Sequence, residues 1–372
     1  MTAPFEIFLA APPGLEPLLA EEAAPIGLAD PRVTPGGVTV QGGWPEVWRA
    51  NLHLRGAGRV LARIGAFRAM HLAQLDKRAR RFPWGETLRP DQPLRIEVTT
   101  RASRIYHAGA ARSRIAAAIR ETLGAPVPDA PPGDALTLKV RIDDDLVTLS
   151  LDTSGAPLHR RGHKQAVNAA PMRETMAALF LRACGYTGAE PVLDPMCGSG
   201  TFPIEAAEIA AGLPPGRSRP FAFERLATHD PEAWAALRAG ILPRPTGLRF
   251  YGSDRDTGAI AKSRANAARA GVGGITDFRH AAISDLVRPE GPPGLVIVNP
   301  PYGARIGKAG RLRPLYAALG ATLRDRLGGW RVGLVTLDPG LAHATGLPFL
   351  APGPPVPHGP LKVRLYQTPP LG

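Results

Sequence analysis

The stretch that most constrains the fold of this chain runs from Val192 to Ala210. Its first residues, Val192 to Asp194, are typical of the end of a buried strand. Two closely spaced glycines, Gly198 and Gly200, then lead into small and apolar residues with helical spacing. Glycine has no Cβ, so the backbone can turn sharply and a ligand can lie against it. Since the amides that begin a helix attract negative charge, the stretch predicts a strand, a ligand-binding turn and a helix.

Three types of nucleotide-binding site have a glycine-rich turn of this kind. A P-loop needs a lysine directly after its last glycine, and none is present. A dinucleotide-binding turn needs a third small residue at position 203, which is proline. Asp194-Pro-Met-Cys-Gly-Ser-Gly-Thr201 resembles instead motif I of the class I methyltransferases that use S-adenosylmethionine (SAM). From this stretch alone, a tight turn without a ligand remains the alternative.

A second motif follows the apolar run Leu295 to Val298 and reads Asn299-Pro300-Pro301-Tyr302. Prolines lack an N–H group and fix φ, so the predicted strand must stop there, at the edge of the sheet where ligands bind. The Asn299 side-chain oxygen and the Pro300 carbonyl can both accept hydrogen bonds from one planar amine, and Tyr302 can stack on a base. An amine held in this way can attack a methyl donor directly, without a protein nucleophile.

About 100 residues separate the two motifs, and together they resemble a class I methyltransferase domain. The resemblance implies a Rossmann-like, seven-stranded α/β sheet, SAM as the cofactor and S-adenosylhomocysteine (SAH) as the product. Asp254 ends the next predicted strand, where a carboxylate can accept hydrogen bonds from ribose hydroxyls. The implied cofactor contacts are Asp194, Pro195, Met196, Gly198, Gly200, Thr201, Asp254, Arg255 and Asp285, and the implied catalytic residues are Asn299, Pro300, Pro301 and Tyr302.

The segment from Phe278 to Leu286 departs from the family pattern. Ala282 stands where the family favours an aspartate that accepts a hydrogen bond from the adenine of SAM, and Asp285 follows three residues later. Either Asp285 takes this role from a shifted position, or a backbone group does.

The first half of the chain is strongly basic. The chain carries a net charge of +13, and residues 44–120 contain 16 Lys and Arg against 5 Asp and Glu. A genome that favours arginine inflates the total but does not explain this concentration, which indicates a polyanionic partner such as RNA. Asp143-Asp144-Asp145 lies between two predicted strands, 136–142 and 146–151, and is expected to form a hairpin turn rather than a metal site.

The order of elements in this half, together with Asp152-Thr-Ser-Gly and Leu158-His-Arg-Arg-Gly162, resembles the RNA-binding THUMP module with its preceding ferredoxin-like subdomain. Arg112 and Arg114 are expected near the start of a helix, where the dipole disfavours cations and a phosphate ligand would explain them. The predicted RNA contacts are Arg101, Arg104, Arg112, Arg114, Arg160, Arg161 and Arg305, the last in a segment similar to the family's Gly-Glu-Arg-Ile-Gly. Arg173 and Glu174, in a helix expected over 169–181, are further candidates beside the SAM pocket.

The length of 372 residues allows several domains. We expect a ferredoxin-like subdomain at 1–64, a THUMP domain at 65–153, a linker at 154–167 and the methyltransferase domain at 168–372. No apolar run approaches the roughly 20 residues of a membrane span, and the first residues do not resemble a secretion signal. Only two cysteines are present, Cys184 and Cys197, so neither a disulfide framework nor a zinc site is indicated. These features favour the cytoplasm.

The chain is therefore expected to be a SAM-dependent RNA methyltransferase that forms N2-methylguanosine, most similar to the 23S rRNA guanine-N2 methyltransferases. Three alternatives stay open. One is guanine-N2 methylation of tRNA, and another is adenine-N6 methylation, which uses the same Asn-Pro-Pro-Tyr motif. The third is a non-catalytic RNA-binding or ribosome assembly factor with a vestigial site.

Overall fold

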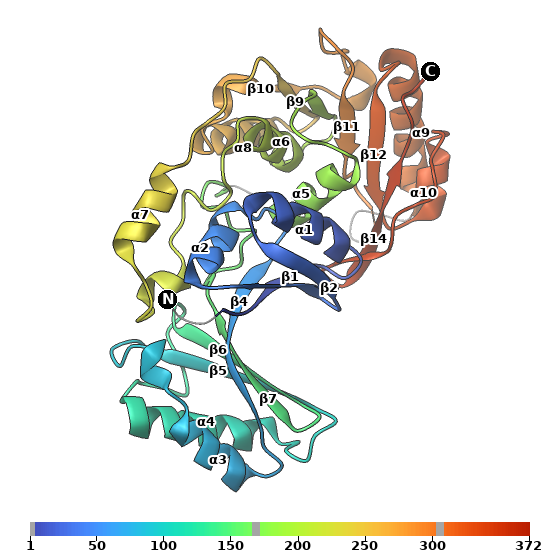
Figure 1. Cartoon of the computed structure of the whole chain (residues 1–372). Coiled ribbons are helices and arrows are strands. Elements are labelled where there is room, and N and C mark those ends of the chain that lie inside the picture. Colours follow the sequence, from blue (N-terminus) through green and yellow to red (C-terminus); the bar gives the residue numbers. More distant parts are fainter. Residues whose placement is uncertain (1–3, 166–171, 303–308) are drawn as a thin grey trace. The chain divides into compact units, whose positions relative to one another are not determined.

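The computed structural model describes residues 4–165, 172–302 and 309–372, with the side chains of 309–311 left aside (Figure 1). The chain divides into two compact units, and it passes from one to the other several times. The first unit consists of residues 1–11, 20–158 and 219–240, and the second of residues 12–19, 159–218 and 241–372.

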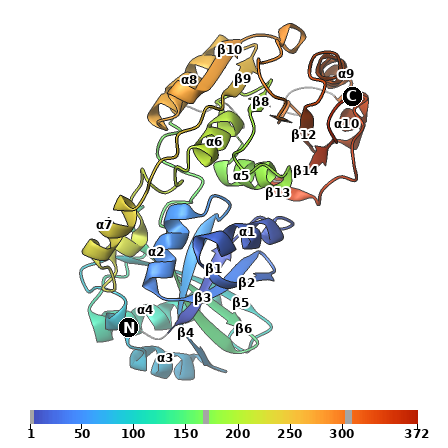
Figure 2. The same ribbon diagram turned by 45° about the horizontal axis from the view of Figure 1, so that its top comes forward.

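The first unit contains one seven-stranded sheet of described residues, in the order β2-β3-β1-β4-β7-β6-β5 (Figure 1). Its strands are β1 (Phe5–Ala10), β2 (Ala29–Thr34), β3 (Gly37–Gly42), β4 (Arg59–Arg68), β5 (Leu94–Arg101), β6 (Leu136–Asp143) and β7 (Leu146–Asp152). Its helices are α2 (Trp44–His53), α3 (Leu72–Arg81), α4 (Ala108–Leu123) and α7 (Pro231–Ala239), while α1 (Glu16–Ala23) is shared between the two units. Helices α3 and α4 lie side by side, and α4 packs on β5 (Figures 1 and 2).

Strand β4 joins the two halves of this sheet. Residues 59–62 pair with β1 on one side, and residues 61–68 pair with β7 on the other. The expected domain boundary between residues 64 and 65 therefore lies inside one strand. Because apolar side chains alternate along the strands, as in β6 with Leu136, Leu138 and Val140 buried, one face of the sheet supplies a core.

Residues 219–240 belong to the first unit, although the sequence assigned them to the methyltransferase domain. Phe223 packs 6.2 Å from Trp48 between ring centroids, and its amide donates to the Thr153 carbonyl over 3.1 Å. The Arg219 guanidinium donates to the backbone carbonyls of Ser154 and two neighbouring residues. These contacts with residues far away in the sequence hold the segment in the first unit. Local sequence patterns do not reveal such contacts.

The second unit holds a second seven-stranded sheet of described residues, in the order β10-β9-β8-β11-β12-β14-β13 (Figure 1). Its strands are β8 (Val192–Asp194), β9 (Phe250–Asp254), β10 (Thr276–His280), β11 (Leu295–Val298), β12 (Arg331–Thr336), β13 (Val356–His358) and β14 (Leu361–Gln367). Its helices are α5 (Glu174–Ala183), α6 (Thr201–Ala210), α8 (Thr257–Arg269), α9 (Ala309–Arg326) and α10 (Pro339–Ala344). The first five strands of this order run parallel, and β14 pairs antiparallel with both β12 and β13. This is the seven-stranded α/β sheet that the resemblance implied.

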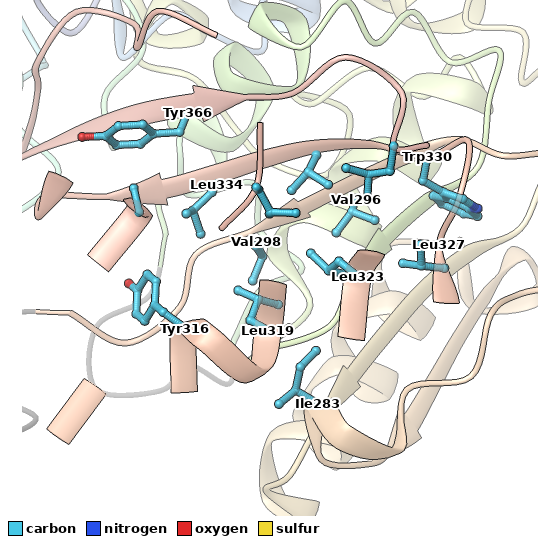
Figure 3. Close-up of a cluster of buried hydrophobic side chains, with 14 of the residues drawn as sticks. Ile283, Val296, Val298, Tyr316, Leu319, Leu323, Leu327, Trp330, Leu334 and Tyr366 are labelled. Atoms are coloured by element: carbon cyan, nitrogen blue, oxygen red, sulfur yellow. The ribbon is translucent and has the colours of Figure 1, made fainter. Parts of the chain in front are cut away.

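Apolar side chains along one face of α9 pack the core of this sheet (Figure 3). Tyr316, Leu319 and Leu323 are fully buried against β11 and β12, together with Val296 and Leu334. All four residues of β11 are buried, as expected for a parallel strand covered on both faces. The motifs at the strand ends therefore stand on a rigid support.

Candidate active site

Three neighbouring strands end at the same edge of the second sheet. In the parallel register, Asp194 at the end of β8 pairs with Gly252 of β9, and Leu193 pairs with Val296 of β11. Asp254 is the last residue of β9, and Asn299 directly follows β11. The sheet thus brings the carboxyl ends of β8, β9 and β11 together, at the edge where open α/β sheets bind ligands.

The turn after β8 has the predicted strand–turn–helix form. Gly198 and Gly200 adopt positive φ angles of 55° and 83°, which non-glycine residues rarely adopt, and α6 begins at Thr201. A Cβ on Gly200 would lie 3.1 Å from side-chain atoms of Ile204, among others. Glycine is therefore required here both by the backbone conformation and by the close packing behind the turn.

Side chains from β9 and α8 fix the position of this turn. The Gly198 amide donates to Oδ2 of Asp254 over 3.0 Å, while the Gly198 carbonyl accepts from Ser263 over 2.9 Å. Asn266 donates to the Ser199 carbonyl over 3.1 Å. Oδ1 of Asp254 accepts from the backbone amide two residues later, so each of its oxygens keeps one lone pair for a ligand. The turn is thus preorganised, and its carboxylate can still accept hydrogen bonds.

Asp194 is almost completely buried at the start of the turn, with 3% of its surface exposed. Burial raises the pKa of its carboxyl group to about 8, and the nearby Asp254 adds to this increase, whereas a hydrogen bond from the Met196 amide opposes it. A cationic ligand beside this carboxyl group would favour its ionised form and lower the pKa again.

Asn299 contributes an acceptor without a partner. Its side-chain Oδ1 is buried, and no residue in the described part of the chain donates a hydrogen bond to it. Pro300 is buried, and Tyr302 is half-buried, with the pKa of its phenol raised to about 12 by burial. The Tyr316 hydroxyl of α9 donates a 3.3 Å hydrogen bond to the Pro301 carbonyl and so helps to hold the motif in position. A buried acceptor without a donor costs free energy, so a ligand that donates a hydrogen bond fits this position.

The other predicted cofactor residues divide into two groups. Pro195 is buried and Met196 packs against the core cluster, so both shape the turn. Arg255 is exposed just after β9, and Asp285 is exposed at the end of a 3-10 turn, where it accepts from its neighbour Ser284.

Lys164 was not predicted, and it lies next to the turn. Its ammonium donates to Oγ1 of Thr201 and to the Met172 carbonyl, each over 2.9 Å, and it pairs with Glu174 at 3.1 Å. Both charged side chains are more than 90% buried. Lys164 lies in an irregular segment with no periodic pattern, so no sequence signal pointed to it. Arg173, the other helix candidate, is exposed.

Arg161 was predicted to contact RNA, and this prediction is wrong because its side chain is buried. Its guanidinium is 1% exposed and donates to Glu205 of α6 over 3.2 Å. Beside this pair, Glu208 accepts from Arg217 and lies 3.7 Å from His163. A side chain this deeply buried is not available to RNA, because exposing it would break its ion pair with Glu205.

The remaining predicted RNA contacts are mostly at the surface. Arg101, Arg104, Arg114 and Arg160 are exposed, and Arg305 lies outside the described residues. Arg112 is half-buried and pairs with Asp129 at 3.3 Å. Since α4 begins at residue 108, Arg112 and Arg114 lie beyond its first turn, and the argument from the helix dipole was wrong.

Comparisons with known proteins agree with this geometry. A family model for the RMKL-like methyltransferase domain matches residues 161–347, and one for the RlmL ferredoxin-like domain matches residues 6–61. The chain belongs to this methyltransferase family. Its members depend on SAM, so the predicted class of enzyme and its cofactor are confirmed at the level of the family.

Two curated relatives carry the name ribosomal RNA large subunit methyltransferase K/L. The protein of Chromohalobacter salexigens is 37% identical over 362 residues, which cover 92% of this chain and 50% of the relative. That of Syntrophotalea carbinolica is also 37% identical, over 364 residues that cover 93% of this chain and 51% of the relative. The chain thus spans about half the length of the curated relatives it matches.

Solved structures show the same fold along the whole chain. A protein of Listeria monocytogenes, described as a predicted N6-adenine-specific DNA methylase, is 31% identical with a TM-score of 0.86, and the match covers 99% of this chain and 97% of that chain. SMU.472, solved in complex with SAH, is 26% identical with a TM-score of 0.84 over the full length of both chains. TrmN of Thermus thermophilus, at 22% identity and a TM-score of 0.74, supports the fold alone and covers 99% and 100% of the two chains.

The described residues include no helix that is both long and apolar enough to cross a membrane.

Proposed function

We propose that the chain is a SAM-dependent RNA methyltransferase that forms N2-methylguanosine, with 23S rRNA as its substrate. The observation that carries this proposal is the buried Oδ1 of Asn299, which has no donor within the described residues and stands beside the glycine turn at the sheet edge. An exocyclic amine supplies the missing donor.

The residues of the turn fit the cofactor. SAM supplies a methyl group bound to a positively charged sulfur. Asp254 keeps lone pairs for two ribose hydroxyls, and Gly198 and Gly200 allow the ligand to lie against the backbone. The positive charge on the sulfur favours the ionised form of the Asp194 carboxyl group, which offsets the free-energy cost of burying that charge. Lys164 positions Thr201 at the first residue of α6.

Asn299 and Pro300 position the substrate in this proposal. The Asn299 side-chain oxygen and the Pro300 carbonyl accept the two N–H groups of the guanine amine, so its nitrogen faces the methyl group. Tyr302 is neutral at physiological pH, since burial raises the pKa of its phenol even further above that pH, to about 12, and its ring stacks on the base. As the nitrogen formed its bond to the methyl carbon, the bond from that carbon to sulfur would break and leave SAH, and the nitrogen would release one proton to solvent. Cys197 takes no part, since burial raises the pKa of its thiol well above the ordinary value.

Several observations support RNA as the substrate class. The two curated relatives are named for large-subunit ribosomal RNA, and a ferredoxin-like domain of the RlmL type occupies residues 6–61. Exposed arginines of the first unit, among them Arg101, Arg104 and Arg114, suit a phosphate backbone. Adenine-N6 methylation is the second candidate, because the Listeria protein carries that description and the same acceptors fit the adenine amine.

The test is methyl transfer from labelled SAM into total RNA of a strain that lacks the gene, followed by separation of rRNA and tRNA. Label in 23S rRNA is the expected result. Label confined to tRNA would retain the chemistry and change the substrate, whereas no label in either RNA would favour an assembly factor. Binding of SAH measured by calorimetry separates an inactive preparation from a protein that does not use SAM.

A further inference from the structure

Tyr106 is the one aromatic residue among the large apolar side chains that the described part of the chain exposes to solvent. It is 82% exposed, and it lies in the loop between β5 and α4, residues 102–107. Tyrosine normally buries most of its ring, so an exposed ring beside the exposed Arg104 points to a ligand. The active site described above does not use this residue.

The loop that carries Tyr106 is rigid because the β6–β7 turn braces it. Asp144 and Asp145 form this two-residue turn with φ angles of 49° and 60°, as in a type I′ hairpin. Oδ1 of Asp145 accepts from the Arg104 amide over 2.8 Å, and the Asp145 amide donates to Ser103 over 3.1 Å. The Asp144 amide donates to the Arg101 carbonyl over 3.3 Å. The aspartates predicted to form a turn thus hold the neighbouring loop in place.

Two further hydrogen bonds fix the chain on either side of Tyr106. The hydroxyl of Thr100 donates to the Tyr106 carbonyl over 3.1 Å. His107 caps α4, since its Nδ1 accepts from the Ala110 amide over 3.0 Å. The backbone is therefore fixed while the ring projects into solvent. A loop whose backbone is already fixed loses little further backbone entropy when a ligand stacks on its ring.

Cationic and apolar side chains gather around the same turn. Met70 is 45% exposed, and its sulfur lies 3.6 Å from the Arg104 guanidinium. Arg68 donates to the Asp144 carbonyl over 2.9 Å. The ion pairs of Arg68 with Asp144 and of Arg104 with Asp145 are 3.8 Å long, and both arginine side chains are largely exposed, so these pairs hold the cations weakly. Arg101 is exposed and has no ion-pair partner in the described part of the chain.

We propose that Tyr106 is a stacking platform for an unpaired RNA base, and that Arg101 and Arg104 contact the adjoining phosphates. This inference depends on the proposed RNA substrate and adds that the first unit recognises a single-stranded element. A lone aromatic ring among arginines matches the way proteins bind unpaired nucleotides. A protein partner would require a larger continuous apolar surface, and here Met70 is the apolar neighbour that the contacts show.

The test compares Tyr106→Ala, Tyr106→Phe and Val33→Ala by fluorescence anisotropy. Val33 is a matched control because it is an exposed apolar residue of the same unit, at 53%. The probes are a labelled 12-nucleotide single-stranded RNA and a blunt RNA duplex with the same number of phosphates. Base–aromatic stacking predicts that Tyr106→Ala binds the single strand about 5- to 100-fold more weakly, whereas Tyr106→Phe and Val33→Ala stay within about twofold of the unchanged chain.

Two further readings make the outcome decisive. Tyr106→Ala should leave duplex binding and the dependence of affinity on salt unchanged, while Arg101→Ala should reduce the salt slope by about one. Equal binding of the single strand by Tyr106→Ala and the unchanged chain would overturn the inference and leave a protein as the occupant. If the unchanged chain binds SAH but neither RNA, the proposed RNA substrate fails as well, whereas loss of binding to both probes by Tyr106→Ala alone would contradict stacking.

Discussion

The backbone amide of Gly198 donates a 3.0 Å hydrogen bond to Oδ2 of Asp254. This bond ties the glycine turn after β8 to the carboxyl end of β9, so one carboxylate both shapes the turn and keeps lone pairs at the sheet edge where we propose that SAM binds. Loss of the Asp254 side chain should therefore affect the cofactor through two routes at once.

Asp254→Ala should weaken SAH binding by about 10- to 100-fold, because ligand hydrogen bonds to a charged group are worth about 1.5–3 kcal/mol. Calorimetric titration with SAH measures this change. Asp256→Ala is the matched control, since Asp256 caps α8 through the Gly258 amide. The control should lose about 1 kcal/mol of stability and keep its SAH affinity. Equal losses of affinity in both variants would mean that Asp254 acts only through the backbone.

Asp194 should make the stability of the ligand-free chain depend on pH. Its folded-state pKa is raised from 3.8 to about 8, so the folded form holds the proton more tightly than the unfolded chain. This contribution is fully present below about pH 4 and is lost as the pH rises towards 8. Asp194→Asn removes it, and its melting temperature should fall less between pH 5.5 and 8.5 than that of the unchanged chain. An equal fall of melting temperature in both proteins between pH 5.5 and 8.5 would show that the pKa of Asp194 is not raised.

The pair of Arg161 and Glu205 should be essential to the second unit. Glu205→Ala should lower the free energy of unfolding by about 3–5 kcal/mol, because it leaves the buried Arg161 guanidinium without its carboxylate. Urea denaturation monitored by circular dichroism measures the loss. Arg313→Ala, at an exposed position of α9 in the second unit, should change stability by less than about 0.5 kcal/mol. A similarly small effect of Glu205→Ala would contradict the buried ion pair.

Asn299→Ala should separate binding from catalysis. The variant loses an acceptor for the substrate amine, so turnover should fall by at least about 100-fold, while RNA affinity, which depends mainly on phosphate contacts, should stay nearly unchanged. Single-turnover methyl transfer and RNA binding should be measured on the same preparation. An equal loss of both would assign Asn299 a structural role.

The sequence predicted the parts of the site that depend on local chemistry. Gly198 and Gly200 were found because the turn needs positive φ angles, and the end of β11 was found because two prolines stop a strand. Leu319 and Leu323 on α9 are buried four residues apart, which is the helical spacing that a sequence pattern can reveal. In each case the residue and its structural reason lie within a few positions of each other.

Other features depend on partners far away in the chain. Arg161 seemed to be a surface cation, and its burial is set by Glu205, 44 residues later. Residues 219–240 group with the first unit through contacts such as Phe223 with Trp48. Tyr106 gave no signal because the sequence does not record exposure. These features follow from tertiary packing, which periodicity and motifs do not describe.

We propose that the site holds the exocyclic amine of a guanine in RNA. Total RNA from a strain lacking the gene should be incubated with the chain and labelled SAM, digested to nucleosides, and analysed by mass spectrometry. The label is expected in N2-methylguanosine, and Asn299→Ala should abolish this labelled product. Label in N6-methyladenosine, or N2-methylguanosine formed equally well by Asn299→Ala, would contradict the proposal.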